Sequence, residues 1–199
     1  MHPVELQPGL WRWTAPHPAW QPGAVTDSPN DWPRDVGCVL YEADDALVFI
    51  DPLVPDDPAF WDWADARCGR RRVVVLTTIA FHRRSRDVLV GRYKASGSRA
   101  KRNMPRGVES LPICGAGETM FWLHKHRALV PGDRIIGAAN QRLRPCPESW
   151  LQYLPGALTV TDLRELLRPL LDLPIESVLV SHGEPVLSGG HAALARALA

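Results

Sequence analysis

Runs of apolar residues separated by short polar stretches divide this chain into expected strands and helices. Residues 73–78, VVVLTT, form a continuous β-branched run, which predicts a strand buried on both faces. Residues 36–43 and 46–53 predict two strands joined as a hairpin at the intervening Asp-Asp pair. Residues 4–15 predict one initial strand in which Leu10 interrupts the alternation. Later strands are expected at 107–113, 118–124, 127–133, 134–138 and 177–181.

Helices are expected where apolar residues recur every three or four positions rather than every two. Asp57 is a plausible N-cap for a helix that has Pro58 at its first position and ends at Gly69. Further helices are expected at 83–95, 147–154, 159–173 and 191–199. Because helices follow buried strands throughout, the pattern predicts a layered α/β domain that spans residues 1–199 without a dividing linker.

Two segments show neither the strand spacing nor the helix spacing of apolar residues. Residues 16–35 contain five prolines and are expected to form a long loop that borders a pocket, since loops of this length in compact domains are usually lids or binding loops. Residues 96–107 are expected to be a basic, flexible connection. Four of the eight tryptophans flank or lie in the long loop, where they could line a ligand site or simply pack the loop: Trp11, Trp13, Trp20 and Trp32.

Length and composition limit the alternatives. A chain of 199 residues with 45% hydrophobic content can bury one full core. It has neither a membrane-length apolar run nor the basic and apolar regions of a signal peptide, so we expect a cytoplasmic protein with no membrane association. The four cysteines are scattered without a C-x-x-C pair and are expected to be small buried residues.

The net charge of +1 conceals an uneven distribution. Residues 67–106 contain 13 lysines and arginines and one acid, Asp87. A positive face of this kind suits anionic small molecules, acidic partners or nucleic acid, unless acids from the rest of the chain fold beside it. Nucleic acid is the least favoured partner, because Tyr93 is the only aromatic residue beside the basic side chains between His82 and Arg106, and stacking therefore has little support.

Four stretches of this sequence together resemble the metallo-β-lactamase-fold superfamily. They are VLYEADDALVFIDPLVP at 39–55, VVVLTTIAFHRRSRD at 73–87, HKHRALVPGD at 124–133 and VLVSHGEPV at 178–186. Their order and spacing match from about residue 36 to residue 190. The resemblance implies a four-layer αββα sandwich, hydrolase activity and a metal site at one edge between the two sheets.

The sequence departs from the superfamily where the metal ligands are expected. In the superfamily the second stretch carries T-H-x-H-x-D-H. Alignment from the strand puts Thr78, Ala80, His82 and Arg83 at the H, H, D and H positions, and alignment from the helix puts Ile79, Phe81, Arg83 and Arg84 there. Neither alignment gives more than one donor, so we expect no binuclear zinc centre and no metal cofactor.

Two further positions keep the residue types of the superfamily site. The resemblance makes Asp133 and His182 metal ligands, and it places Cys114 near the position of a third histidine. An alternative is therefore a hydrolase with one zinc or other divalent ion, held by Asp133 and His182 with Cys114 or His82. Without a metal, Asp133 would hydrogen-bond turn amides and His182 would end a strand.

The arginines give the leading hypothesis. If Arg83 and Arg84 begin a helix where metal ligands normally stand, their charge and the helix N-terminus favour an anion such as a carboxylate or phosphate. Ion pairs with Asp51, Asp133 or Glu184 are the alternative use of these arginines. The sequence thus predicts a degenerate, hydrolase-like protein that binds an anionic small molecule or partner. Its expected pocket residues are His82, Arg83, Arg84, Asp133 and His182.

Overall fold

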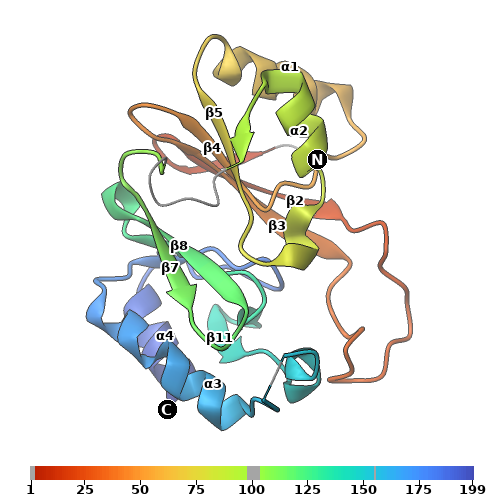
Figure 1. The fold of residues 1–199 in the computed structure, drawn as a ribbon, viewed down its shortest axis with the longest axis vertical. Coiled ribbons are helices and arrows are strands. Elements are labelled where there is room, and N and C mark those ends of the chain that lie inside the picture. Colours follow the sequence, from red (N-terminus) through yellow and green to blue (C-terminus); the bar gives the residue numbers. More distant parts are fainter. Residues whose placement is uncertain (1–2, 98–103, 155) are drawn as a thin grey trace.

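Two β-sheets pack face to face in the computed structural model, which describes residues 3–97, 104–154 and 156–199 (Figure 1). Within these residues the first sheet has the strand order β1-β2-β3-β4-β5-β6. Its first four strands are antiparallel, whereas β4, β5 and β6 run parallel. The strands are β1 (Val4–Gln7), β2 (Leu10–Pro16), β3 (Asp35–Glu42), β4 (Leu47–Ile50), β5 (Val73–Leu76) and β6 (Ser96–Gly97).

The second sheet has the order β12-β9-β8-β7. It consists of β7 (Val108–Ile113), β8 (Glu118–Leu123), β9 (Ala128–Val130) and β12 (Ser177–Val178). A separate hairpin of β10 (Ile135–Ala138) and β11 (Arg142–Pro145) extends from it.

Helices cover the outer faces of both sheets. The first sheet carries α1 (Pro58–Cys68) and α2 (Arg86–Tyr93), and the second carries α3 (Val160–Leu167) and α4 (Gly190–Leu198). Short 3-10 helices are η1 (Ala80–Arg83), η3 (His124–His126), η4 (Glu148–Leu151) and η5 (Arg168–Asp172). Among the described residues, no helix combines the length and the apolar character needed to cross a bilayer.

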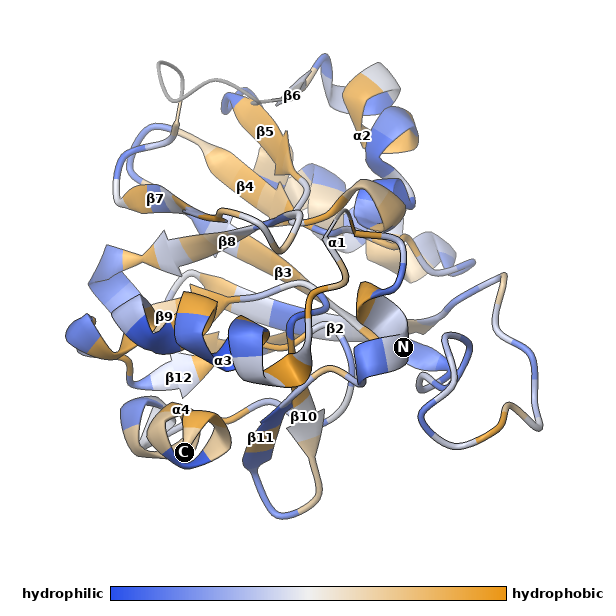
Figure 2. Ribbon diagram, turned by 60° about the horizontal axis from the view of Figure 1, so that its bottom comes forward, coloured by the Kyte–Doolittle hydropathy of each residue, from blue (hydrophilic) through white to orange (hydrophobic). Residues whose placement is uncertain are grey.

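The period-two pattern of the strands explains these layers. In β5, Val73 and Val75 pack toward α1 and α2, whereas Val74 and Leu76 pack toward the second sheet. Both faces are therefore buried, and β4 and β5 are coloured as hydrophobic along their length in Figure 2. In β8, the same alternation sends Phe121 between the sheets and Trp122 toward α3 and α4. The αββα prediction is confirmed.

Several predicted elements differ in their limits. Residues 4–15 form two strands rather than one, because Gly9 adopts a φ of 79° and reverses the chain. The helix expected at 83–95 begins only at Arg86. The helix expected at 147–154 is reduced to η4, and the one expected at 159–173 divides into α3 and η5 beside Pro169, which lacks the amide N–H of a continuous helix. The helix at 57–69 is confirmed, with the Asp57 carboxylate accepting from the Ala59 amide at 3.0 Å.

The long proline-containing segment lies between β2 and β3, and residues 17–34 form neither helix nor strand. Its backbone is tied across its base, where the His17 amide donates to the Arg34 carbonyl at 2.8 Å. Half of the basic connection expected at 96–107, residues 98–103, lies outside the described residues.

One close backbone approach fixes the edge where the two sheets meet. The Gly37 amide donates to the Ser181 carbonyl at 2.7 Å, and the Gly137 amide donates to the His182 carbonyl at 2.8 Å. A Cβ atom on Gly137 would lie 2.1 Å from the Glu184 carbonyl oxygen. The turn at 181–184 is therefore held between β3 and β10, and only glycine permits this distance.

We expect Gly137→Ala to lower the free energy of unfolding by about 1–3 kcal/mol, because the added methyl group forces the two backbones apart. Gly91→Ala in α2 is the matched control. Its Cβ would meet nothing within 4 Å, and alanine favours the helix, so this variant should gain about 0.5–1 kcal/mol. Urea denaturation followed by circular dichroism measures both. Equal stability of Gly137→Ala and the parent would contradict the close approach.

Candidate functional site

Polar side chains from five separate parts of the chain meet at this edge of the sandwich. Asp51 follows β4, Thr78 follows β5 and His82 lies in η1. Asp133 lies between β9 and β10, and His182 follows β12. Four of these side chains are buried and Asp133 is partly buried. Such a group of polar side chains is stable inside a protein only if its members satisfy one another.

Asp51 holds the inner part of this group together. Its backbone has a φ of 48°, a left-handed conformation that aspartate tolerates better than most residues. One carboxylate oxygen accepts from the Thr78 amide at 2.8 Å, and the other accepts from the Thr78 hydroxyl at 2.5 Å. The second oxygen also lies 2.8 Å from Nδ1 of His82. Since a carboxylate only accepts, Nδ1 carries the proton and Nε2 faces the opposite way.

The outer part is a compact group of nitrogen and oxygen atoms. Nε2 of His82 lies 2.9 Å from Oδ1 of Asp133, and Nε2 of His182 lies 3.2 Å from the same oxygen. Despite these short distances, Oδ1 is buried and has no hydrogen bond of ordinary geometry with any described residue. One donor atom from each of the three side chains lies within 4.8 Å of the other two. We call His82, Asp133 and His182 the three-ligand group, because each offers one atom that could bind a common metal ion.

Burial and charge set the protonation of these residues. Burial would lower the pKa of His82, but Asp133 and Asp51 raise it to about 9. Burial also lowers the pKa of His182, and Asp133 offsets this only in part. Although burial opposes it, the two imidazoles hold the pKa of Asp133 well below its usual range. Near pH 7, His82 therefore carries a positive charge between the carboxylates of Asp51 and Asp133, and His182 is neutral.

Glu118, the first residue of β8, orients the loop that carries Asp133. Its buried carboxylate accepts from the amides of Gly132, Asp133 and Arg134 at 2.7–2.9 Å. Burial raises the pKa of Glu118 to about 7, with a further contribution from Asp133. A Cβ atom on Gly132 would lie 2.4 Å from the Thr78 hydroxyl, so this glycine lets the loop approach the end of β5.

Arg84 connects three segments around the site. Its guanidinium donates to the carbonyls of Gly37 and Asp51 at 3.1 and 2.9 Å and to the Ser181 hydroxyl at 2.7 Å. Arg83 points away from the site. Its side chain is 59% exposed and pairs with Asp87 at 3.0 Å. The two arginines precede α2 and lie on either side of a kink, where Arg84 has a φ of 38°.

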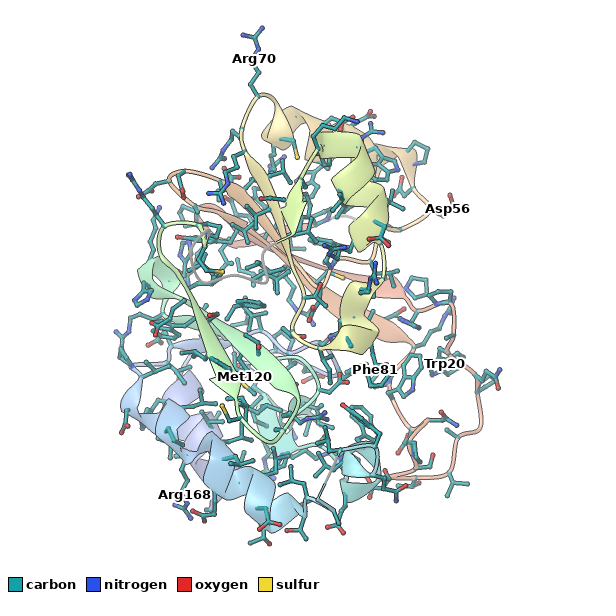
Figure 3. All side chains as sticks on the ribbon, in the orientation of Figure 1. Trp20, Asp56, Arg70, Phe81, Met120 and Arg168 are labelled. Atoms are coloured by element: carbon teal, nitrogen blue, oxygen red, sulfur yellow. The ribbon has the colours of Figure 1, made fainter. Side chains whose placement is uncertain are left out.

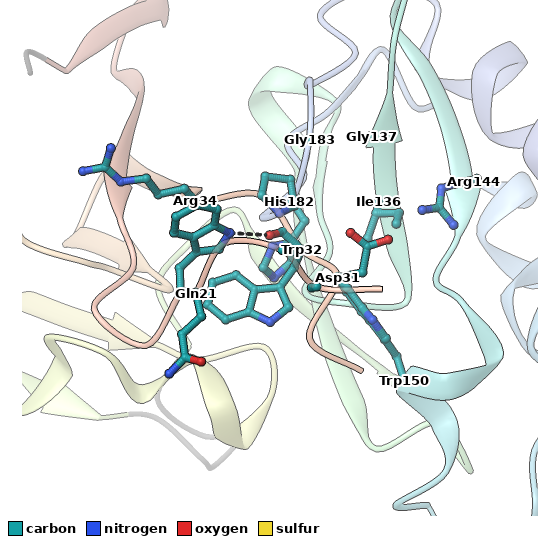
Figure 4. A pocket seen from close by; sticks show the side chains of 14 residues that line it. Gln21, Asp31, Trp32, Arg34, Ile136, Gly137, Arg144, Trp150, His182 and Gly183 are labelled. Carbon is teal, nitrogen blue, oxygen red and sulfur yellow. Dashed lines mark hydrogen bonds between the residues drawn. The ribbon is translucent and has the colours of Figure 1, made fainter. Parts of the chain in front are cut away.

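Two adjoining cavities open at the site. One of about 360 Å³ is lined by His82, Asp133, His182 and Arg84, with Phe81 and Tyr153 among its aromatic residues. The second, of about 390 Å³, lies between the 16–35 segment and the β10–β11 hairpin (Figure 4). Trp32, Trp150 and His182 border both cavities. The Trp32 carbonyl accepts from the Trp20 indole at 3.0 Å, the contact dashed in Figure 4.

The structure thus brings together three of the expected pocket residues, His82, Asp133 and His182, with Arg84 beside them. Arg83 lies on the surface outside both cavities. Cys114 is exposed in the turn between β7 and β8 and is not part of the three-ligand group. Thr78 and Ala80 carry no imidazole, and among the described residues His82, Asp133 and His182 are the one group of three donor side chains whose ligand atoms lie within 4.8 Å of one another.

Two residues that position the site were not identified as such from the sequence. Glu118 is a lone acid at the start of an otherwise apolar strand, and this contrast was the available signal. Thr78 stands where the superfamily has a histidine. Its hydroxyl and amide both bind Asp51, so it supports the site without facing a ligand.

Comparison with known proteins identifies the fold. No protein-family model and no curated protein matches the sequence. Solved structures that match include the metallo-beta-lactamase from Hirschia baltica, with a TM-score of 0.63, 16% identity and coverage of 99% of this chain and 95% of that one. The DIM-1 metallo-beta-lactamase exposed to ceftazidime matches with a TM-score of 0.62, 12% identity and coverage of 99% and 94%. The chain therefore has the metallo-β-lactamase fold over nearly its whole length.

We expect Arg84→Ala to lower the free energy of unfolding by about 1.5–3 kcal/mol, because it leaves the Gly37 and Asp51 carbonyls without their charged donor. Arg83→Ala is the matched control and should keep the urea midpoint of the parent, since its ion pair is exposed. If the two variants are equally stable, Arg84 does not connect the three segments as described.

Proposed function

We propose that the chain is a hydrolase with a reduced metal site, in which His82, Asp133 and His182 bind one divalent metal ion beside a cavity for a small anionic substrate. The observation that carries this proposal is the convergence of three donor atoms within 4.8 Å of one another. The metallo-β-lactamase fold supports the reaction class, because the group lies at the sheet edge where the resemblance expects a metal.

The surroundings of the three residues also suit a metal. Oδ1 of Asp133 is buried without a hydrogen bond of ordinary geometry to the described residues. His182 has a lowered pKa and is neutral, as a ligand must be. Asp51 accepts from Nδ1 of His82, so Nε2 is the nitrogen that would bind a metal on loss of its proton, the arrangement by which carboxylates orient metal-binding histidines. Two imidazoles and one carboxylate are a donor set typical of catalytic zinc.

A zinc ion bound by three protein ligands would supply a water molecule whose pKa is lowered to about 7. The chain's own residues fix the geometry around that position. Asp51 sets the ring orientation of His82, and Glu118 sets the position of Asp133 through three backbone amides. Trp32 and Trp150 pack edge-on to His182, with ring centroids 6.0 and 5.3 Å away, and restrict the position of its ring.

The balance of charge in the cavity favours an anion. Its described lining contains two positive groups, Arg84 and the imidazolium of His82, and a single acid, Asp133. A divalent ion would add to this positive charge. The anion is attracted by the cavity as a whole, since the hydrogen bonds of Arg84 go mainly to backbone and Ser181 and Arg83 lies outside.

A second candidate is a metal-free binding protein. His82 lies between two carboxylates and has a pKa of about 9, so its imidazolium offsets part of their negative charge without a metal. The same cavity would then bind an anionic small molecule or partner without hydrolysing it. Metal stoichiometry separates the two candidates.

Zinc binding tests the first candidate directly. We expect chelator-treated protein to bind close to one equivalent of Zn²⁺ in isothermal titration calorimetry, and Asp133→Ala to lose this binding because one of three ligands is removed. His124→Ala is the control, since His124 is an exposed histidine paired with Glu109 at the surface. Circular dichroism establishes that each variant is folded. If the parent binds no zinc, manganese or iron saturably, the metal-free candidate replaces the first.

A further inference from the structure

We propose that the ligand of this site carries a flat aromatic ring adjoining its anionic group, and that Phe81 and Tyr153 bind this ring at the mouth of the cavity. The inference rests on the proposed function in one respect, because it places the anionic group at His82, Asp133 and His182. It adds the chemical class of the ligand, an aromatic carboxylic acid or a derivative of one.

Phe81 and Tyr153 are exposed to a degree that aromatic side chains seldom are. Phe81 is 64% and Tyr153 is 51% exposed, and they are the only aromatic residues among the strongly exposed large hydrophobic side chains of the described chain. They also contact each other, with ring centroids 5.1 Å apart at an interplanar angle of 88°. Single exposed hydrophobic residues are ordinary, but an adjoining aromatic pair at a cavity mouth indicates a binding surface.

The pair continues into the cavity as an aromatic lining. Trp32, Trp150 and His17 line the same cavity, and each comes from a segment remote from η1 in the sequence. Trp32 contacts His17 edge-on at 5.0 Å. Phe81 lies between the half of the molecule built on the first sheet and the half built on the second sheet (Figure 3). Edge and face contacts between rings favour an aromatic guest over a saturated one of the same size.

Contacts within the protein fix the Tyr153 side chain and the turn that carries Phe81. The Tyr153 hydroxyl accepts from Arg134, whose side chain is completely buried. Phe81 directly precedes His82 in η1, and the His82 amide donates to the Ile79 carbonyl at 2.9 Å. The same short turn therefore directs His82 inward and Phe81 outward. A ring bound against Phe81 lies next to the three-ligand group, so the ring and the anionic group must adjoin in the ligand.

The size of the cavity agrees with such a ligand. At about 360 Å³ it falls at the small end of the usual range for ligand pockets, roughly 300–1,000 Å³. This volume accommodates one aromatic ring with a short acidic substituent. Asp133 is the only acid among the described lining residues, so the cavity offers little to a cationic ligand.

Phenylacetate, cyclohexylacetate and acetate separate ring recognition from charge and size. We expect phenylacetate to bind zinc-supplemented protein saturably in isothermal titration calorimetry, about three- to tenfold more tightly than cyclohexylacetate, the range that aromatic pairs contribute. Phe81→Ala should abolish this preference without changing zinc binding. Val88→Ala is the matched control: Val88 is 55% exposed on α2, lines neither cavity, and its removal should leave the preference intact.

The same titrations on chelator-treated protein distinguish the two proposals. If zinc binds but phenylacetate has no advantage, or if Phe81→Ala keeps the advantage, the aromatic inference is overturned and the metal site stands. If zinc does not bind but the preference for phenylacetate persists and depends on Phe81, the inference stands and the metal proposal fails. Absence of saturable phenylacetate binding in both forms of the protein overturns the inference.

Discussion

The carboxylate of Asp51 lies at the end of β4 in a left-handed backbone conformation and accepts from the amide and hydroxyl of Thr78 and from Nδ1 of His82. These contacts join two neighbouring parallel strands to the turn that follows them. They also fix which nitrogen of His82 faces Asp133, because the carboxylate accepts the proton on the other. A buried carboxylate is costly unless several donors surround it, so this one residue requires Thr78 and His82 to remain in place.

The loop at Asp133 and the turn at Ser181 are fixed by side chains that lie beside the site, Glu118 and Arg84. Glu118 determines the path of the loop at Asp133, and Arg84 binds β3, the end of β4 and the turn at Ser181. Both are charged groups that bond mainly to backbone atoms. Such contacts specify where the chain runs rather than which ligand it binds. The geometry at His82, Asp133 and His182 can therefore persist with or without a metal.

The succession of strands and helices predicted a layered α/β domain, and the resemblance to the metallo-β-lactamase-fold superfamily supplied the αββα order of its layers. The limits of the short helices could not be predicted from the sequence. Pro169 and the positive φ of Arg84 each interrupt a helix at a single backbone position. The resemblance identified Asp133 and His182. His82 was expected in the pocket and, as a metal ligand, only as an alternative to Cys114. The fold of its turn is what brings its Nε2 to Asp133. Arg83 and Arg84 point in opposite directions because Arg84 has a φ of 38°. The pattern of apolar and polar residues does not predict this backbone conformation.

Trp32 and Trp150 form a common boundary between the two cavities, and His182 borders both. A molecule in either space would therefore contact these rings, and one in the space beside the β10–β11 hairpin would touch the same imidazole of His182 that lies against Asp133.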